Sequence, residues 1–419
     1  MRILFLTPAF PPFPGGGERY AGALALHLTQ RGHEVCVLTS GAKVEQDFWR
    51  GCIPEQSSED LNQDYRVLRK PVFFIPGGRF TLFCWRKAMV LLSALPGDQS
   101  ALLMKMARVV PPIKEYKTVL GQLAPSFDLL HGFNISWEYP LVEGWRVSRT
   151  LQTPFVITPF AHFGSVGRDR VALNSTMDHQ RRMLMDADAV LTLTSIESQN
   201  LQHYGVTGNR LDVIGGGVNE RPQFPQPDLI AAKYQLGQPF AIFIGRASYD
   251  KGALHAMEAV TRLCRKGVSL NLVLIGQSTP EFARHFSRLS RDDRRAIRPL
   301  GIIDEEEKHA LLEASTMLLL PSRSDSFGIV LLEAWMHEKP VVGADVGGIP
   351  GVVDDGHNGF LVRFGDVTGL MGATERLLTD EDLRRRMGQH GREKIESLYT
   401  WEKVTDRVLA NYHRVLAAD

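Results

Sequence analysis

Short apolar runs alternate with amphipathic stretches along the whole chain, and this alternation restricts the fold more than any other feature. The runs form two series, the first at 3–6, 35–39, 129–130, 155–158, 190–193 and 211–214, and the second at 241–245, 272–275, 317–320, 341–342 and 360–362. Runs of this length are typical of buried parallel strands, and the stretches between them are typical of covering helices. The sequence therefore predicts two parallel α/β sheets.

Chain length and a proline-rich segment indicate where the two sheets separate. A chain of 419 residues is too long for one compact α/β core. Residues 221–227, Arg-Pro-Gln-Phe-Pro-Gln-Pro, are typical of a linker. We therefore expect an N-terminal domain at 1–218 and a C-terminal domain at 219–399. An amphipathic helix predicted over 401–416 could pack on either domain.

Charge, cysteine usage and hydropathy exclude several classes of protein. The formal charge is +1, which argues against a general nucleic-acid binder. The four cysteines are scattered, without the spacing of a zinc site or a disulfide framework, and this fits a reducing compartment. The opening Met-Arg-Ile-Leu-Phe-Leu-Thr-Pro is too short for a signal peptide, and no apolar run reaches membrane-spanning length. We expect a cytoplasmic protein, either soluble or on the inner face of the cytoplasmic membrane.

Two carboxylates, Asp325 and Glu333, stand eight positions apart after the run 317–320. Since 328–337 has the pattern of an amphipathic helix, Asp325 falls in the preceding loop and Glu333 about two turns into the helix. Ligands of parallel sheets bind beyond the carboxyl ends of the strands, against helix N-termini. A bound anion would then face the backbone amides of Ser326, Phe327, Gly328 and Ile329. The alternative is that Asp325 only begins a helix and Glu333 is a solvated surface residue.

A glycine-rich loop follows the first strand of the first series. Gly15, Gly16 and Gly17 precede a predicted helix at about 18–31, where glycines allow backbone N–H groups to approach a phosphate closely. The loop matches neither Gly-x-Gly-x-x-Gly nor a Walker sequence, which disfavours a dinucleotide oxidoreductase and a P-loop ATPase. A tight strand-to-helix turn is the alternative interpretation.

Two cations follow the first strand of the second series, in Gly245-Arg246 and Lys251-Gly252. Arginine offers a planar fork and lysine a point charge, and the pair suits a diphosphate. Because the negative charge of a diphosphate grows as it leaves, these cations would stabilise the transition state more than the ground state. The alternative is a pair of solvated loop residues.

Two histidines follow strands of the first series, His131 after 129–130 and His162 after 155–158. Both are expected to project from strand ends into the cleft that contains the glycine loop, although a lone histidine is more often structural. His131 and Asn134 are predicted on the acceptor side of a site. No cluster of His, Cys and Asp has metal-ligand spacing, so no metal is expected.

Residues 66–117 contain ten Lys or Arg against two acids, Asp98 and Glu115, interleaved with many aromatic side chains. A basic, aromatic-rich amphipathic segment can lie on an anionic bilayer or receive a lipid-linked ligand. The alternative is a helical insertion that packs on its own domain with its charges solvated.

Together these residues resemble the retaining glycosyltransferases of family four, which have the GT-B fold, two Rossmann-like α/β domains facing each other across a cleft. The likeness covers most of the chain and includes Gly15-Gly16 and Arg31-Gly-His-Glu-Val35 in the first domain. The resemblance implies that Arg246 and Lys251 grip the donor diphosphate and that His162 lies near the reacting sugar. It also implies that the nucleotide base stacks near Ile302 and Ile303, and that the helix at 400–419 crosses back to the first domain.

The sequence departs from the family pattern at three places. The family has a glutamate, seven residues and a second glutamate, whereas this chain has Asp325 at the first position and Glu333 only at the second. In relatives the first carboxylate lies by the donor sugar and the second binds the ribose hydroxyls. Gly351 replaces a common glutamate, and the segment 215–219 replaces a more usual Asn-Gly-Val-Asp. The departures leave the identity of the donor open.

The resemblance implies a retaining, metal-independent transferase that takes its sugar from a nucleoside-diphosphate sugar, UDP- or GDP-linked, as donor substrate and needs no cofactor. The acceptor would be a carbohydrate or a lipid-linked precursor of a glycolipid or polysaccharide. Peripheral membrane contact through 66–117 is a separate hypothesis, which comes from the basic and aromatic composition of that segment. Two alternatives stay open, a GT-B sugar-nucleotide epimerase and a non-catalytic subunit that binds a sugar nucleotide.

Overall fold

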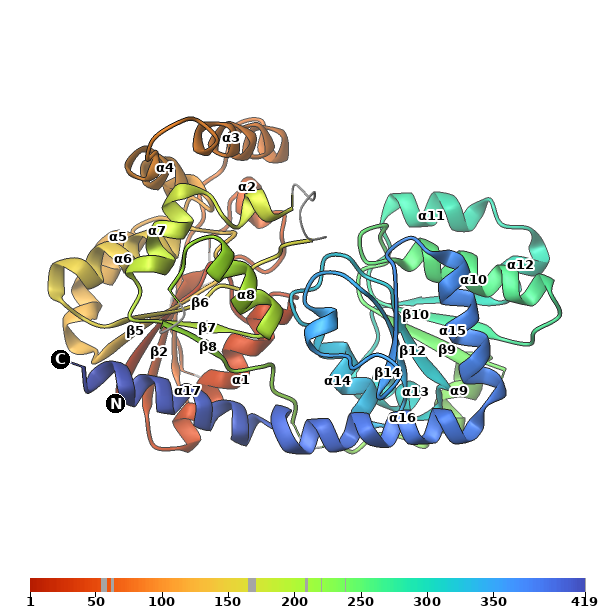
Figure 1. The fold of residues 1–419 in the computed structure, drawn as a ribbon. Helices are drawn as coiled ribbons and strands as arrows, with labels where there is room; N and C mark the ends of the chain where they lie inside the picture. Colours follow the sequence, from red (N-terminus) through yellow and green to blue (C-terminus); the bar gives the residue numbers. More distant parts are fainter. Residues whose placement is uncertain are drawn as a thin grey trace. The chain divides into compact units, whose positions relative to one another are not determined.

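The computed structural model describes residues 1–53, 59–61, 64–164, 171–207, 210–219, 221–237 and 239–418. The chain divides into two compact units. Figure 1 follows the chain by colour, from red at the N-terminus to blue at the C-terminus. The first contains the chain up to Phe163, the segment that ends at Gly216, and the helix that begins at Trp401. The second runs from Gly217 to Thr400. The boundaries expected from the sequence, after 218 and 399, differ from these by one or two residues.

The first unit is built on an eight-stranded sheet in the order β3-β4-β2-β1-β5-β6-β7-β8. Neighbouring strands are parallel except β3 and β4. The strands are β1 (Arg2–Leu6), β2 (Glu34–Ser40), β3 (Glu59–Leu61), β4 (Arg66–Lys70), β5 (Leu129–Phe133), β6 (Phe155–Thr158), β7 (Ala189–Thr192) and β8 (Leu211–Val213). The helices are α1 (Gly16–Gln30), α2 (Asp47–Arg50), α3 (Gly78–Ser93), α4 (Ser100–Met106), α5 (Tyr116–Leu123), α6 (Tyr139–Leu151), α7 (Asp178–Asp186), α8 (Ser195–His203) and α17 (Trp401–Leu416), with short 3₁₀ turns at Ala107–Val109, Ala124–Ser126 and Ala172–Asn174.

The second unit is built on a six-stranded parallel sheet in the order β11-β10-β9-β12-β13-β14. The strands are β9 (Phe240–Ile244), β10 (Asn271–Ile275), β11 (Ile297–Gly301), β12 (Met317–Leu320), β13 (Val341–Ala344) and β14 (Gly359–Val362). The helices are α9 (Pro227–Lys233), α10 (Ala253–Arg265), α11 (Pro280–Ser287), α12 (Arg291–Arg295), α13 (Glu305–Ala314), α14 (Ile329–Met336), α15 (Val367–Thr379) and α16 (Glu381–Lys394), with a 3₁₀ turn at Ile349–Gly351 after β13 and a π-helical turn at Ile395–Tyr399 after α16.

In each sheet there is one point from which the chain adds later strands on the opposite side of its first strand. In the first unit β1 lies between β2 and β5, and in the second β9 lies between β10 and β12. All residues of β9, and all residues of β1 except Arg2, are buried, as expected for parallel strands covered by helices on both faces. The loops that leave the carboxyl ends of two such neighbouring strands run apart and leave a crevice, the usual ligand site of open α/β sheets.

Every apolar run predicted as a strand forms one, but three strands were not predicted. β4 carries Arg66, Arg69 and Lys70 among its five residues, and the sequence interpretation had assigned it to the basic segment. β11 contains Arg298 and Pro299 and is an edge strand, where a missing N–H is tolerated. The segment 66–117 is therefore not a purely helical insertion, because its first five residues belong to the sheet.

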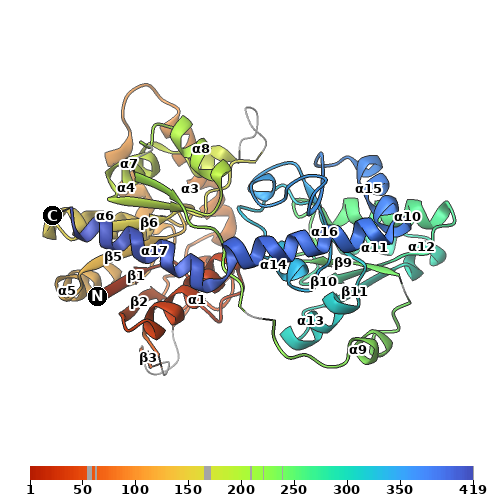
Figure 2. The same cartoon turned by 60° about the horizontal axis from the view of Figure 1, so that its bottom comes forward.

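Helix α17 packs on the first unit. The indole of Trp401 stacks on the His27 ring of α1, with ring centroids 5.4 Å apart, and it also contacts the ring of Tyr20 at 5.2 Å. Figure 2 shows α17 beside α1. Of the two packing partners that the sequence left open for this helix, the structure shows the first unit.

Candidate functional site

The crevice of the second unit lies where β9 and β12 pair, with Ala241 beside Met317 and Ile242 beside Leu318. The loop after β9 contains Arg246 and Lys251, and the loop after β12 contains Asp325. Sequence reasoning placed all three at strand ends of one sheet. The strand order shows in addition that these strands are neighbours at the switch point.

The two loops are fixed against each other by backbone contact. Gly252 has a φ of 77°, and a Cβ atom at this position would lie 2.0 Å from the carbonyl oxygen of Pro321. Only glycine therefore allows this approach. The amide of Arg323 donates to the carbonyl of Asp250 at 3.0 Å, and its guanidinium donates to the Asp250 carboxylate at 2.7 Å. The loop after β12 thus fixes both neighbours of Lys251 in the sequence, Asp250 and Gly252.

The ammonium of Lys251 donates to Oδ1 of Asp325 at 2.7 Å, and both side chains are mostly buried. The aspartate thus holds the lysine at the mouth of the crevice, while Arg246 stands exposed at the end of β9. A partly buried ammonium paired with one carboxylate retains two N–H donors for a second anion. The arrangement suits a phosphate group bound beside Asp325.

The loop after β13 supports the backbone of the carboxylate loop. The amide of Gly348 donates to the carbonyl of Asp325 at 2.8 Å, and a Cβ atom on Gly348 would lie 1.8 Å from the carbonyl oxygen of Ser326. Close backbone packing therefore requires glycine at position 348. Gly328 then caps α14 in the left-handed region, with φ 83°, and the first amides of that helix point out of its N-terminus.

The other residues that the sequence predicted at the donor site differ in burial and in the groups that a ligand could contact. The ring of Phe327 is buried and packs against Tyr399 at 5.5 Å, so only its backbone can face a ligand. Ile302 is exposed and Ile303 half-buried, directly after the edge strand β11. Gly245 lies at the end of β9, and its amide donates to the carbonyl of Ile275.

Glu333 lies on α14 and pairs with a buried lysine that sequence reasoning missed. Its Oε1 accepts from Nζ of Lys308 at 2.9 Å, and the side chain of Lys308 is only 5% exposed. Lys308 also donates to Glu305 at 2.6 Å. Oε2 of Glu333 is buried and, within the part of the chain that the structure describes, has no hydrogen-bond partner. Such an oxygen is an acceptor for a hydroxyl donor.

In the first unit, the glycine loop and the loop of His162 lie together. A Cβ atom on Gly17 would lie 3.0 Å from the ring of Phe160, which also contacts the ring of Tyr20 at 5.5 Å. The carboxylate of Glu18 folds back over Gly15, because a Cβ atom there would lie 2.0 Å from Glu18 Oε2. Burial raises the pKa of Glu18 to about 7. A carboxyl group therefore occupies the helix N-terminus at which the sequence predicted a phosphate beside Gly15 and Gly16.

Glu197 is a second residue that sequence reasoning missed. It is almost fully buried, and its carboxylate accepts from the amide of Ala161 at 2.7 Å and from the amide of Leu193 at 2.8 Å. Burial raises the pKa of Glu197 to about 7. The hydroxyl of Thr194 accepts from the Glu197 amide, so Thr-x-x-Glu at the start of α8 was the available signal. Glu197 fixes the backbone immediately before His162.

We expect Glu197→Gln to destabilise the folded protein by about 1 to 3 kcal/mol, because an amide group cannot accept from both backbone N–H donors and one of them is left unpaired. A melting curve of the variant measures the effect. Glu402→Gln, at an exposed position, is the matched control. An unchanged Tm in the Glu197 variant would show that the loop does not depend on this carboxylate.

The expectation for His131 is wrong. Strand β5 continues to Phe133, so His131 lies inside the sheet and not beyond its end. Its side chain is fully buried, with Nδ1 hydrogen-bonded to the hydroxyl of Tyr412 at 2.6 Å and Nε2 to that of Thr158 at 2.8 Å. Burial lowers the pKa of His131 to about 3, so the ring is neutral. His131 is a core residue that holds α17 to the sheet.

Asn134 directly follows β5. It has a φ of 71°, and its Oδ1 accepts from the amide of Ser136 at 3.1 Å, which is a turn-forming role. His162 is half-buried at the end of the loop after β6, and its amide donates to Ser175 at 3.4 Å. Among the residues that the structure describes, no group of three or more His, Cys, Asp or Glu is placed to hold a metal ion.

Family models match both units of the chain. The model described as Glycosyl transferase 4-like domain matches residues 15–217, and the model described as Glycosyl transferases group 1 matches residues 229–394.

Relatives of known name match over nearly the whole chain. N-acetyl-alpha-D-glucosaminyl L-malate synthase of Bacillus anthracis is 30% identical and covers 97% of this chain and 96% of its own length. Glycogen synthase of Mycobacterium tuberculosis is 25% identical over 96% of this chain and 92% of its own length.

Solved structures share the fold. Sucrose-phosphate synthase of Thermosynechococcus elongatus superposes with a TM-score of 0.73 at 21% identity and covers all of both chains. Anabaena HepE in complex with UDP superposes with a TM-score of 0.70 at 18% identity, covering 99% of this chain and 100% of its own. These likenesses show the two-sheet GT-B fold.

Proposed function

The chain belongs to the group 1 glycosyltransferases and uses a nucleotide sugar, and from this premise we propose that it transfers a sugar with retention of anomeric configuration to a carbohydrate or lipid-linked acceptor. The observation that carries the proposal is the ion pair of Lys251 and Asp325, 2.7 Å apart, on the loops that leave the neighbouring strands β9 and β12. Arg246 lies in the same loop as Lys251. A diphosphate fits these cations and a sugar hydroxyl fits the carboxylate.

We propose that the donor nucleotide binds the second unit. Oε2 of Glu333 would accept from a ribose hydroxyl, and the backbone amides of residues 326–329, which lead into α14, would contact a phosphate. The base would lie on Ile302 and Ile303. A UDP- or GDP-sugar is the proposed donor, and the HepE neighbour, which was solved with UDP, supports the uridine alternative.

The proposed mechanism needs no classical base. Diphosphate departure, helped by Lys251 and Arg246, breaks the bond between the anomeric carbon and the phosphate oxygen. The acceptor hydroxyl attacks the same face, and the leaving phosphate oxygen takes its proton. Asp325 would contact the donor sugar and keep Lys251 in place.

The first unit would bind the acceptor, with His162 near the reacting sugar and Asn134 at the end of β5. A precursor of a glycolipid or polysaccharide is the proposed acceptor class. We propose that the reaction uses no metal and no cofactor other than the donor, and that the protein works in the cytoplasm. The last point is supported by the four cysteines, all described in the structure, which form no disulfide with one another.

A ligand-stability screen tests the donor proposal. The protein is heated with UDP-, GDP-, ADP- and TDP-sugars, each with its free nucleoside as control. A donor present at about 100 times its Kd stabilises the folded state by about 2.7 kcal/mol, which gives a clear rise in Tm. The rise should be much smaller with Lys251→Ala. A flat response to every nucleotide sugar would contradict the proposal.

A further inference from the structure

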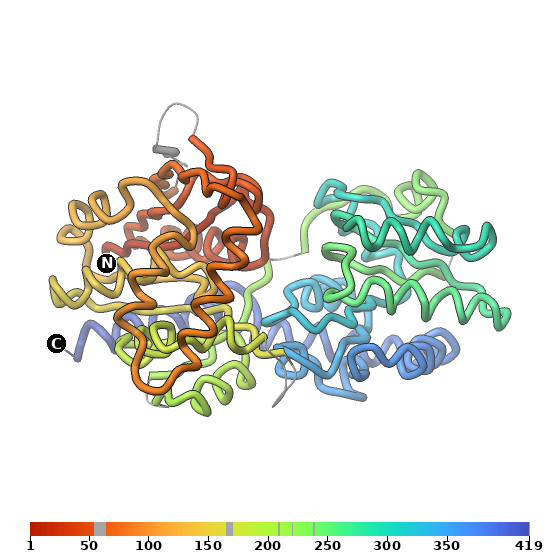
Figure 3. The backbone as a smooth tube through the Cα atoms, turned by 90° about the horizontal axis from the view of Figure 1, so that it is seen from above, coloured from red at the N-terminus to blue at the C-terminus, as the bar shows by residue number. Residues whose placement is uncertain are grey.

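Helix α3 turns apolar side chains outward along its whole length. Phe80, Phe83 and Leu91 are 75%, 57% and 69% exposed. Their spacing places them on one face of the helix, which also carries the exposed Cys84 and Lys87. Figures 1 and 3 show α3 on the outside of the first unit. A surface helix of a soluble domain normally turns such a stripe toward the core.

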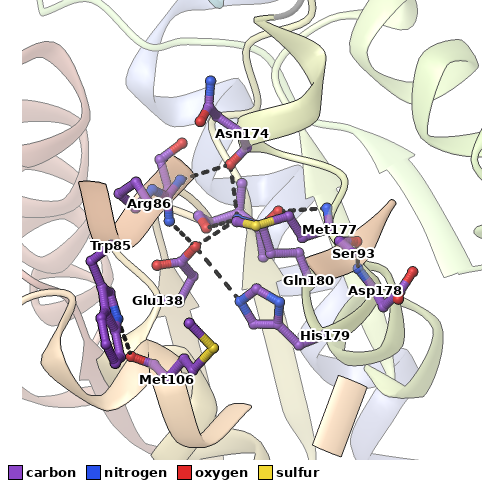
Figure 4. A network of polar contacts seen from close by, with 12 residues as sticks. Trp85, Arg86, Ser93, Met106, Glu138, Asn174, Met177, Asp178, His179 and Gln180 are labelled. Carbon is purple, nitrogen blue, oxygen red and sulfur yellow. Dashed lines mark hydrogen bonds and ion pairs between the residues drawn. The ribbon is translucent and has the colours of Figure 1, made fainter. Parts of the chain in front are cut away.

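The opposite face of α3 carries the polar contacts of the helix, in addition to the buried Leu82 and Met89. Arg86 forms an ion pair with Glu138 and donates to the carbonyl of Asn174 at 3.1 Å (Figure 4). The indole of Trp85 donates to the carbonyl of Met106 at 3.0 Å. Near the end of the helix, Ser93 accepts from the amide of Asp178 at 2.9 Å.

These contacts prevent α3 from rotating its aromatic side chains inward. Glu138 is fully buried, and burial alone would raise its pKa, but Arg86 and the neighbouring His179 outweigh burial and lower it. The carboxylate is therefore charged and needs Arg86 as its partner. A rotation of the helix would leave a buried charge without its cation, which costs several kcal/mol.

The charges around the stripe indicate the partner. Helix α3 contains no Asp or Glu, and its Arg79 and Lys87 are exposed. The ammonium of Lys87 lies 5.4 Å from the centre of the Phe83 ring, so cation and aromatic ring share one face. Phe73 and Phe74, in the loop before α3, are also exposed. A second copy of this chain would bring the same excess of cations, whereas an anionic lipid surface would attract it.

We propose that the outward face of α3, with Phe73 and Phe74, docks on the surface of an anionic lipid bilayer, its rings entering the headgroup region and Lys87 contacting lipid phosphates. None of the helices in the described ranges is both long and apolar enough to pass through a bilayer. The docking proposal goes beyond sugar transfer and does not depend on the donor, so each can fail without the other.

Vesicle flotation tests the docking surface. The full chain should float with vesicles of phosphatidylglycerol and phosphatidylcholine in equal parts, and much less with phosphatidylcholine alone. The triple variant Phe80→Ser, Phe83→Ser, Leu91→Ser should partition at least about 100-fold less, because three apolar side chains no longer enter the bilayer. Lys87→Gln should reduce partitioning about fivefold. Leu229→Ser, at an exposed position on α9, is the matched control.

A reporter at Cys84 tests the contact directly, because this exposed cysteine lies within the stripe. An environment-sensitive fluorophore at Cys84 should shift to the blue with anionic vesicles and be quenched by lipid nitroxides. The same label on the variant Cys84→Ser, Ser287→Cys, placed on α11, should not respond. The proposal is overturned if the wild type does not float, if the triple variant floats equally well, or if the triple variant abolishes a dimer seen by light scattering without vesicles.

Discussion

Replacing Lys251 with alanine is expected to slow sugar transfer about 100- to 1,000-fold, the usual effect of removing one group that stabilises developing charge. The reason is that the ammonium, held 2.7 Å from Asp325, would face the leaving diphosphate, whose negative charge grows as the bond breaks. The loss should appear mainly in kcat, with a smaller rise in the donor KM.

Two further variants test whether the loss of activity is specific to the Lys251 side chain. Lys266→Ala removes an exposed lysine at the end of α10, in the same unit, and should leave kcat unchanged. Asp325→Asn keeps the shape of the loop but weakens the hold on Lys251, and should give an intermediate loss. A Lys251→Ala enzyme with wild-type kcat and an unaltered melting temperature would remove Lys251 from the reaction.

Replacing Glu333 with alanine is expected to weaken binding of the donor nucleotide about 10- to 100-fold, as the loss of hydrogen bonds to a charged group predicts. Its Oε2 is the buried acceptor that we assign to the ribose. Titration calorimetry with the nucleoside diphosphate measures the effect, and the deoxyribose form of the same nucleotide should bind the variant and the wild type with a smaller difference.

A variant of Lys308 distinguishes a ribose contact of Glu333 from a purely structural role of this glutamate. Lys308→Met leaves the carboxylate in place without its buried cation, so we expect a smaller loss of affinity and a lower Tm. Glu306→Ala, at an exposed position on α13, is the matched control. If Glu333→Ala bound the nucleotide like the wild type but melted earlier, the glutamate would serve only to neutralise Lys308.

The fold was largely predictable because its central strands are continuous apolar runs, which need covering on both faces. The three strands that escaped prediction, β3, β4 and β11, carry charges or proline in their sequences, and all lie at or next to the edge of their sheets. There, solvent rather than a helix covers part of the strand, so the apolar pattern that marks a buried strand is weak.

The pairing of Lys251 and Asp325 was partly predictable, since parallel strands bring their carboxyl ends to one edge. The core position of His131 could not be predicted, because its environment depends on Tyr412, which lies 281 residues later in the chain. Lys308 and Glu197 were missed for a similar reason. Each becomes notable only through burial beside a residue from another element. The Thr-x-x-Glu pattern marks the start of α8, but it shows neither the burial of Glu197 nor its contact with the amide of Ala161.

Proton NMR of the full chain incubated with nucleotide sugars, without an acceptor, tests the central claim most directly. Water then replaces the acceptor, and the account predicts slow release of the nucleoside diphosphate from one donor together with a sugar that first appears in the donor's own anomeric configuration. Release of the opposite anomer would contradict retention. Conversion of the donor sugar into an epimer while the diphosphate stays attached would contradict sugar transfer itself.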